Sequence, residues 1–183
     1  QRLGLGHVEI LLVHDIGTIA FPDAMLDKPV STYTADEHQR YRRHTIEGET
    51  ALMALSQLQG VAKIVRQHHE RVDGKGFPDG LAGAAITMGA RIVAAASDLD
   101  ELTHGALGEL TLSEDKARSM LTGGVGSHYD GAVVETLLKV AEDLATAAQN
   151  DVQIEAHDLR PGMVLARAVL SAKGATLLAA GYV

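Results

Sequence analysis

Five residues of this sequence have side chains that could bind metal ions together: His14, Asp15, His44, His68 and His69. They offer one carboxylate and four imidazoles, and we expect all of them on or near helix ends. Helix bundles build two-metal sites in this way. Imidazole with carboxylate suits Fe, Mn, Ni or Zn rather than Ca or Mg. Two such ions would generate a hydroxide and bind a phosphoryl oxygen, so the pattern indicates phosphohydrolase chemistry.

Each of these residues has an ordinary alternative role when it is considered alone. A single His-Asp pair is usually solvated or structural, and His44 would be a helix cap or a half-buried core residue. His68 and His69 are neighbours in a predicted helix, where side chains differ in direction by about 100°, so an exposed polar pair is the simple alternative. The combination, with the histidine pair running into a glycine-rich loop, favours a metal site.

Composition limits the classes of function. The chain has 183 residues, 46% of them hydrophobic, which suits one domain with an appendage. A net charge of −8, with two Phe, four Tyr and no Trp, argues against binding nucleic acid polymers. The absence of Cys excludes disulfides and thiolate metal sites. No apolar run approaches the length of about 18 residues that a membrane span needs, and no secretory signal precedes the helices. We therefore expect a cytoplasmic location and no membrane contact.

Hydrophobic periodicity predicts that residues 1–149 are helical. Thr34 and Glu37 form a capping-box pattern, which predicts the start of a helix that runs towards Arg43. A helical stripe continues after it to Gly60, which we expect to end the helix. The other predicted helices cover residues 3–13, 61–72, 89–102, 114–121 (opened by a second capping box at 111–114) and 130–148, with one helical turn at 23–26 and a glycine-rich loop at 73–80.

The composition changes after residue 149. Three short strands are predicted over residues 152–155, 163–169 and 175–178, separated by turns at Pro161-Gly162 and Lys173-Gly174. The sequence therefore predicts an all-α multi-helix bundle over residues 1–149 and a small β module over residues 150–183. Because residue 1 already lies inside an apolar pattern, we expect the chain to be part of a longer protein.

The string His68-His69-Glu70-Arg71-x-Asp73-Gly74-x-Gly76-Phe77-Pro78 is the most specific motif of the sequence. With it occur His14-Asp15-Ile16-Gly17, Pro22-Asp23, Lys28-Pro29, His44 and Ala90-Arg91-Ile92-Val93. Together these segments resemble the HD-GYP subgroup of the HD-superfamily phosphohydrolases, over residues 3–144. Phe77 stands where that family has the tyrosine of its Gly-Tyr-Pro motif.

The resemblance implies an HD-type helical bundle with a two- or three-metal site, often iron, and hydrolysis of the cyclic dinucleotide cyclic di-GMP. By motif position Asp15 would bridge the metals, and His14 would belong to one site. The histidines His44, His68 and His69 would complete the other. The catalytic residues would be Asp15 and His14. Substrate-binding or loop roles fall to Asp73, Gly76, Phe77, Pro78, Arg91 and Asp100. For the loop Gly76-Phe77-Pro78 the resemblance implies a surface for a signalling-protein partner or for access to the site, and a rigid structural turn beside the site is an equally favoured alternative.

Departures from the family pattern predict weakened catalysis. Thr18 stands where the family has a lysine that contacts substrate phosphate. After Ala90-Arg91-Ile92 the family carries a motif with two Asp residues, and the first of them is a metal ligand. Ser97 stands at the position of that first Asp, and Asp100 is the second. Asp98 is a candidate replacement ligand, although a shift of one helical residue turns its side chain by about 100°. Further along the chain, Ala106 and Glu109 stand at two positions where the family has basic residues.

Two hypotheses therefore stay open. The first is a cyclic di-GMP phosphodiesterase of HD-GYP type, weakened by these departures. The second is a catalytically inactive, metal-binding regulatory or scaffold module of a bacterial signalling protein. A phosphohydrolase of the wider HD superfamily acting on another nucleotide is a third, less favoured alternative. The nearby cations Arg71, Lys75 and Arg91 could compensate for the missing lysine, and each has a structural salt bridge as its alternative role.

Overall fold

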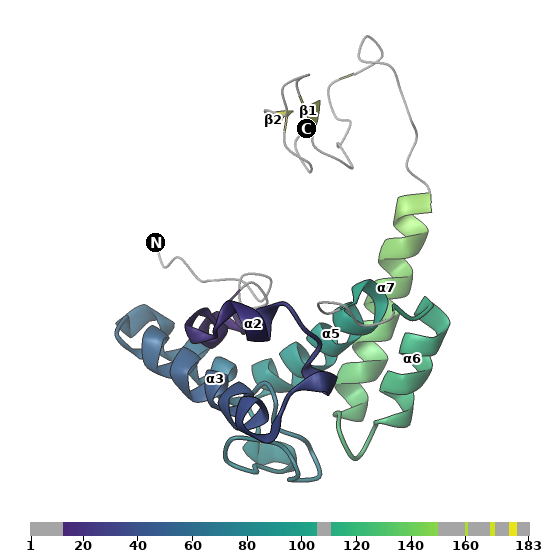
Figure 1. The fold of residues 1–183 in the computed structure, drawn as a ribbon. Helices are drawn as coiled ribbons and strands as arrows, with labels where there is room; N and C mark the ends of the chain where they lie inside the picture. The colour runs from purple at the N-terminus through teal and green to yellow at the C-terminus, as the bar shows by residue number, and fades with distance from the viewer. Residues whose placement is uncertain (1–12, 106–110, 150–159, 161–168, 171–175, 179–183) are drawn as a thin grey trace. The chain divides into compact units, whose positions relative to one another are not determined.

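The computed structural model describes residues 13–105, 111–149, 160, 169–170 and 176–178. They fall in two compact units, one ending at Leu138 and the other beginning at Lys139. The first unit is helical, as predicted (Figure 1). Its helices are α2 (Asp23–Leu26), α3 (Ala35–Met53), α4 (Gln59–Gln67), α5 (Met88–His104), α6 (Glu114–Gly123) and the start of α7 (Gly131–Gln149), with short 3-10 helices η1 (Ile16–Ala20), η2 (Val30–Thr32), η3 (Ser56–Leu58) and η4 (Gly83–Ala85) between them.

Helix α3 begins with the predicted capping box. The Glu37 N–H donates to Thr34 Oγ1 at 3.3 Å, and the Thr34 N–H donates to Glu37 Oε2 at 2.8 Å. The prediction that Gly60 ends the following helical stripe was wrong. The chain leaves α3 after Met53, where Leu55 takes up an extended conformation, and Gly60 lies in the first turn of α4.

The second predicted capping box, at residues 111–114, does not form. Ser113 is the N-cap of α6, and it makes no side-chain capping hydrogen bond. A capping box needs its glutamate at the third helical position, but Glu114 is the first residue of α6. There its carboxylate stabilises the helix through the positive end of the helix dipole instead.

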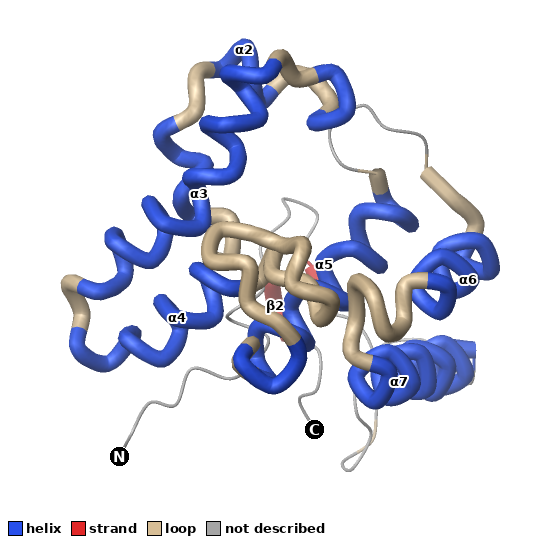
Figure 2. Tube along the Cα trace, turned by 90° about the horizontal axis from the view of Figure 1, so that it is seen from below, coloured by secondary structure: helices blue, strands red, loops and turns tan. Residues whose placement is uncertain are grey.

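Helix α5 connects two hydrophobic clusters. The first joins Leu52 of α3 and Val61, Ala62 and Val65 of α4 to Val93 of α5. The second joins Ala95 of α5 to Leu121 of α6 and to Tyr129, Val133 and Val134. Val93 and Ala95 lie two residues apart and so point to nearly opposite sides of the helix. In both views α5 accordingly lies between the α3–α4 pair and α6 (Figures 1 and 2).

The turn that carries His14 and Asp15 packs tightly onto α3 through Gly17. A Cβ atom at this position would lie 2.0 Å from the carbonyl oxygen of His44 and 2.8 Å from the backbone nitrogen of Gly48. Both atoms belong to the helix backbone and cannot rotate away. Only glycine therefore allows the turn to come this close to the helix that carries His44.

The second unit contains the rest of α7 and an antiparallel pair of strands, β1 (Val169–Leu170) and β2 (Thr176–Leu178). Other parts of the predicted β module, including the strand at 152–155, lie outside the described residues, as does most of the predicted helix at 3–13. The domain boundary at 149/150 thus stays a prediction. Among the described helices, none has the length and hydrophobicity needed to cross a membrane.

Candidate metal centre and adjoining cavity

Four of the five predicted ligands meet at one point: Asp15, His44, His68 and His69 each place a ligand atom within 4.8 Å of the others. Asp15 Oδ1 lies 3.2 Å from His44 Nε2 and 3.4 Å from His68 Nε2. The two Nε2 atoms are 3.3 Å apart. His44 and His68 are buried, whereas Asp15 and His69 are partly exposed. The cluster thus has a closed inner side and a side that solutes can reach.

Backbone carbonyls fix the tautomer of both buried rings. His44 Nδ1 donates to the carbonyl of Tyr41 at 2.5 Å, and His68 Nδ1 donates to the carbonyl of Val65 at 2.6 Å. Because a carbonyl only accepts, Nδ1 carries the proton and Nε2 of each neutral ring carries a lone pair. Two imidazole lone pairs and a carboxylate oxygen therefore face one small space. They repel one another unless a cation lies between them.

The spacing of these atoms fits a single metal ion. With metal–nitrogen bonds of roughly 2.0–2.1 Å, neighbouring ligand atoms of a tetrahedral or octahedral ion lie roughly 2.9–3.4 Å apart. The three distances of 3.2, 3.3 and 3.4 Å fall in this range. Burial also lowers the pKa of His68 and of His69, which favours the neutral, metal-binding form of both rings.

The prediction that His68 and His69 lie within a helix was wrong, because α4 ends at Gln67. The residues around the pair hold the following loop instead of continuing the helix. The buried carboxylate of Glu70 accepts from the N–H groups of Asp79 at 2.7 Å and Leu81 at 2.9 Å. The His68 and His69 rings are tilted by 43° to each other, with centroids 4.1 Å apart, and both reach the cluster.

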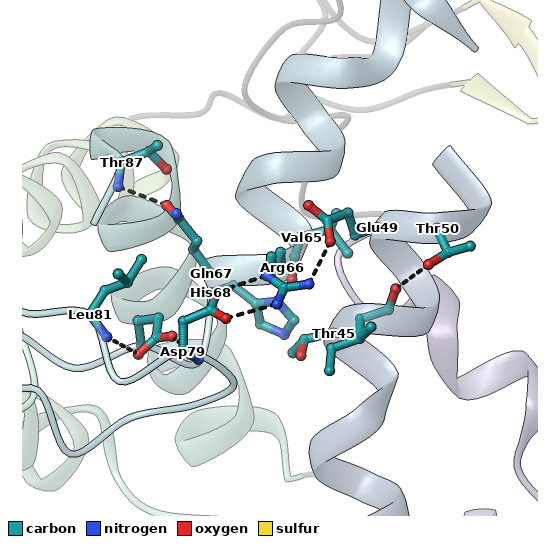
Figure 3. A network of polar contacts seen from close by, with 12 residues as sticks. Thr45, Glu49, Thr50, Val65, Arg66, Gln67, His68, Asp79, Leu81 and Thr87 are labelled. Atoms are coloured by element: carbon teal, nitrogen blue, oxygen red, sulfur yellow. Dashed lines mark hydrogen bonds and ion pairs between the residues drawn. The ribbon is translucent and has the colours of Figure 1, made fainter. Parts of the chain in front are cut away.

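Arg66 fastens the same loop to α3. Its guanidinium donates to both carboxylate oxygens of Asp79, at 2.7 and 2.8 Å, and to Glu49 of α3 at 2.7 Å. Figure 3 shows Arg66 between these two acids, with the Gln67 side chain reaching the backbone of Thr87 beside it. The end of α4 is thus tied to elements on both sides, and the histidine pair after it has a fixed position.

The glycine-rich loop folds back onto the histidine pair. A Cβ atom at Gly76 would lie 2.4 Å from the nitrogen of Arg71 and 2.5 Å from the Cα of Glu70, so this approach requires glycine. The next residue, Phe77, donates its N–H to the carbonyl of His69 at 3.2 Å. Its ring stacks on the His69 ring, with centroids 4.7 Å apart and planes 24° apart. The Gly-Phe-Pro segment therefore forms part of the site itself.

A cavity of about 430 Å³ adjoins the cluster. His69 and Tyr41 border both, and the Tyr41 hydroxyl lies 3.2 Å from His69 Nε2. Rings and charged groups make up most of the wall: Val30, His38, Tyr41, Arg42, His69, Arg71, Lys75, Gly76, Phe77, Asp98, Glu101 and His128. Sequence reasoning missed Tyr41 and Arg42, although both lie within one turn of His44 on the same helix.

The structure places His14 beside the cluster rather than among the four grouped ligand atoms. His14 Nε2 lies 3.2 Å from Asp15 Oδ2, the carboxylate oxygen that does not face His44 and His68. Ser97 is buried and donates to the carbonyl of Ala94 at 3.3 Å. Asp98 lines the cavity and accepts from the Tyr129 hydroxyl at 2.5 Å. Neither Ser97 nor Asp98 contributes to the cluster.

The remaining predicted residues have other surroundings. Asp100 is exposed and pairs with His104 at 2.9 Å. Arg91 donates to Asp130 at 2.7 Å and to the carbonyl of Ile86 at 3.0 Å, which ties α5 to the start of α7. Asp73 accepts two hydrogen bonds from Arg71 and so shapes the loop. Pro78 is half-buried in that loop. Ala106 and Glu109 lie outside the described residues.

Comparison with known proteins agrees with this architecture. The chain is 35% identical over 145 residues to a probable cyclic di-GMP phosphodiesterase of Vibrio cholerae, covering 75% of this chain and 33% of the relative. It is 34% identical over 171 residues to the cyclic di-GMP phosphodiesterase response regulator RpfG of Xanthomonas campestris, covering 89% of this chain and 44% of the relative. The chain therefore spans less than half the length of these relatives.

A solved structure has the same fold. Bd1817, described as a HDG"Y"P protein from Bdellovibrio bacteriovorus, matches with a TM-score of 0.59 at 22% identity, over 73% of this chain and 44% of that one. The family model described as HD domain matches residues 10–133, which include all five predicted metal ligands. The resemblance read from the motifs is confirmed: this chain belongs to the HD domain family.

Proposed function

We propose that this chain is a metal-dependent phosphodiesterase of HD-GYP type that hydrolyses a cyclic dinucleotide, with cyclic di-GMP as the first substrate to test. The observation that carries the proposal is the convergence of lone pairs from Asp15, His44 and His68 beside an open cavity. The names of the relatives from Vibrio cholerae and Xanthomonas campestris support the choice of substrate.

The four clustered side chains would hold a divalent transition metal, Fe, Mn, Ni or Zn. When bound, such an ion supplies Lewis-acid chemistry towards a phosphoryl oxygen and a water nucleophile. His14 orients the outer oxygen of Asp15 from 3.2 Å. The rings of the cavity, foremost Tyr41, would stack on a base, because aromatic faces bind bases of any sequence.

The expectation of weak turnover rests on two side chains. Thr18 Oγ1 donates to the carbonyl of Asp15 at 2.8 Å, so it turns to the backbone and is not part of the cavity wall. Ser97 supplies no carboxylate to the cluster, so a second metal would lack the ligand that the family carries there. These two observations also favour a second candidate function, a metal-binding regulatory module without catalysis.

Metal analysis and turnover together test the proposal. Purified protein should contain at least one equivalent of transition metal, and the Asp15→Asn variant should contain much less. Cyclic di-GMP hydrolysis should be slow, and Ser97→Asp combined with Thr18→Lys should raise it. Metal binding with no turnover in either protein would favour the regulatory module. A metal-free protein that still hydrolyses the substrate would contradict the proposed centre.

Two further parts of the proposal concern the cellular setting. We place the chain in the cytoplasm, in a bacterial signalling protein, because its relatives include a response regulator. We also place contact with a signalling partner at the Gly76-Phe77-Pro78 loop, on its outer face next to the exposed Asp79 and Gly80. A pull-down with the intact protein, compared with an Ala82→Glu and Ala84→Glu double variant at exposed positions just after this loop, tests the second point, because these changes leave the Arg66–Asp79 pair in place. Equal capture by both proteins would contradict it.

A further inference from the structure

We propose that Arg42 and Lys75 form the phosphate-binding subsite of this cavity, replacing the lysine that the family carries where this chain has Thr18. The inference rests on the proposed function, since it takes the ligand to be a phosphate ester. It assigns a role to Arg42, which no motif of the sequence marks. Both side chains lie on the wall of the cavity that adjoins His69.

The other cations near the cluster already have partners. Arg71 lines the cavity, but its guanidinium makes two hydrogen bonds to Asp73, at 3.0 and 2.7 Å. Arg91 is bound to Asp130 and to a backbone carbonyl. By contrast, no acid lies within ion-pair distance of Arg42 or Lys75 in the part of the chain that the structure describes. These two cations can therefore bind an anion without first giving up a salt bridge.

Arg42 is also held in place. Its guanidinium lies 4.9 Å from the centre of the Phe77 ring, a cation–π contact. Phe77 in turn stacks on His69 at 4.7 Å. Arginine, aromatic ring and metal-binding imidazole thus form one stack that runs from the cavity wall to the cluster. A planar guanidinium supported on one face keeps its N–H edges for a phosphate, which it can bind through two oxygens.

Charge favours this assignment. The whole chain carries a net charge of −8, so its overall charge opposes the approach of a phosphodiester. The cavity also has two acids on its wall, Asp98 and Glu101. An anion can enter against these charges only where cations outweigh them locally. Arg42 supplies positive charge close to His69, where the scissile phosphate has to lie, and Lys75 adds a second cation to the same cavity wall.

The test compares Arg42→Gln with Arg43→Gln. Arg43 is the next residue of α3, carries the same charge, and pairs with Glu47 at 3.6 Å outside the cavity. Binding of cyclic di-GMP to metal-loaded protein is measured by calorimetry at low and high salt.

Arg42→Gln should weaken binding about tenfold and reduce its salt dependence, whereas Arg43→Gln should leave both the affinity and its salt dependence unchanged. Arg42→Lys should bind with intermediate affinity, because it keeps the charge but loses the planar stack. Where turnover is measurable, KM should rise and kcat should stay the same.

Equal binding by the unmodified protein and Arg42→Gln would overturn the subsite and leave the proposed function intact. Failure of the unmodified protein to bind any cyclic dinucleotide would overturn the proposed substrate instead. In that case GMP and inorganic phosphate serve as probes. Arg42-dependent binding of either would uphold the subsite, and binding that ignores Arg42, or no binding, would overturn it. Circular dichroism and thermal unfolding identify a variant that has lost its fold, and Arg42→Lys then serves as the test variant.

Discussion

Replacing Gly17 with alanine should separate the two halves of the metal cluster. The new methyl group would lie 2.0 Å from the carbonyl oxygen of His44, about 1.4 Å short of an ordinary contact. Because the atoms it meets are helix backbone, the turn itself has to move. Overpacking of this kind costs about 3 kcal/mol. With a urea m-value of about 2 kcal/mol per M, the midpoint of unfolding should fall by about 1.5 M.

The same movement displaces Asp15, whose Oδ1 lies only 3.2 Å from His44 Nε2. Metal content per folded protein should therefore fall together with stability. Gly60→Ala is the matched control, because a Cβ at Gly60 meets nothing within 4 Å and alanine is the better helix former. This control should raise the midpoint slightly and keep the metal. Gly17→Ala protein with the midpoint and metal content of the unmodified chain would refute the argument.

Three further predictions concern the cluster and the loop beside it. Asp15→Asn should lower the metal content measured by elemental analysis while circular dichroism keeps its helical signal. Glu70→Gln should lower the free energy of unfolding by about 1–3 kcal/mol, because an amide accepts only one of the two N–H groups that the carboxylate accepts; unchanged urea unfolding would contradict this. Arg66 lowers the pKa of Asp79 below its ordinary value of 3.8, so this pair stabilises the fold above pH 3.8 and the contribution is lost as pH falls through the lower, folded-state pKa. Arg66→Met should therefore flatten the loss of stability below about pH 4, whereas Arg43→Met should leave the acid profile unchanged.

Much of the helical fold could be predicted because its signals are local. The capping box at Thr34 and Glu37 depends on two residues three positions apart, and it forms as predicted. One error arose where longer-range contacts decide. The helix at His68 ends because Glu70 bonds to Asp79 and Leu81 far along the chain, and no local propensity reports such a contact.

The residues of the cluster could be predicted from their types and the family motif, but the geometry around them could not. That Asp15, His44, His68 and His69 meet follows the family motif, and the structure groups these four. On the cavity wall, the sequence points to Lys75 as a candidate cation but not to Arg42, which belongs to no motif. The two side chains line one cavity because Gly76 lets the loop fold back onto residues 69–71.

The cluster also bears on the conformational entropy of the unfolded chain. Its ligands come from three separate segments, and His44 and His68 alone are 24 residues apart. A cation bound by them would act as a reversible cross-link in a chain that has no cysteine and so no disulfide. Closing a loop of this length in the unfolded state removes about 3.5 kcal/mol of chain entropy in the simple polymer estimate. Metal supply would thereby affect not only the chemistry of the site but also the stability of the folded domain.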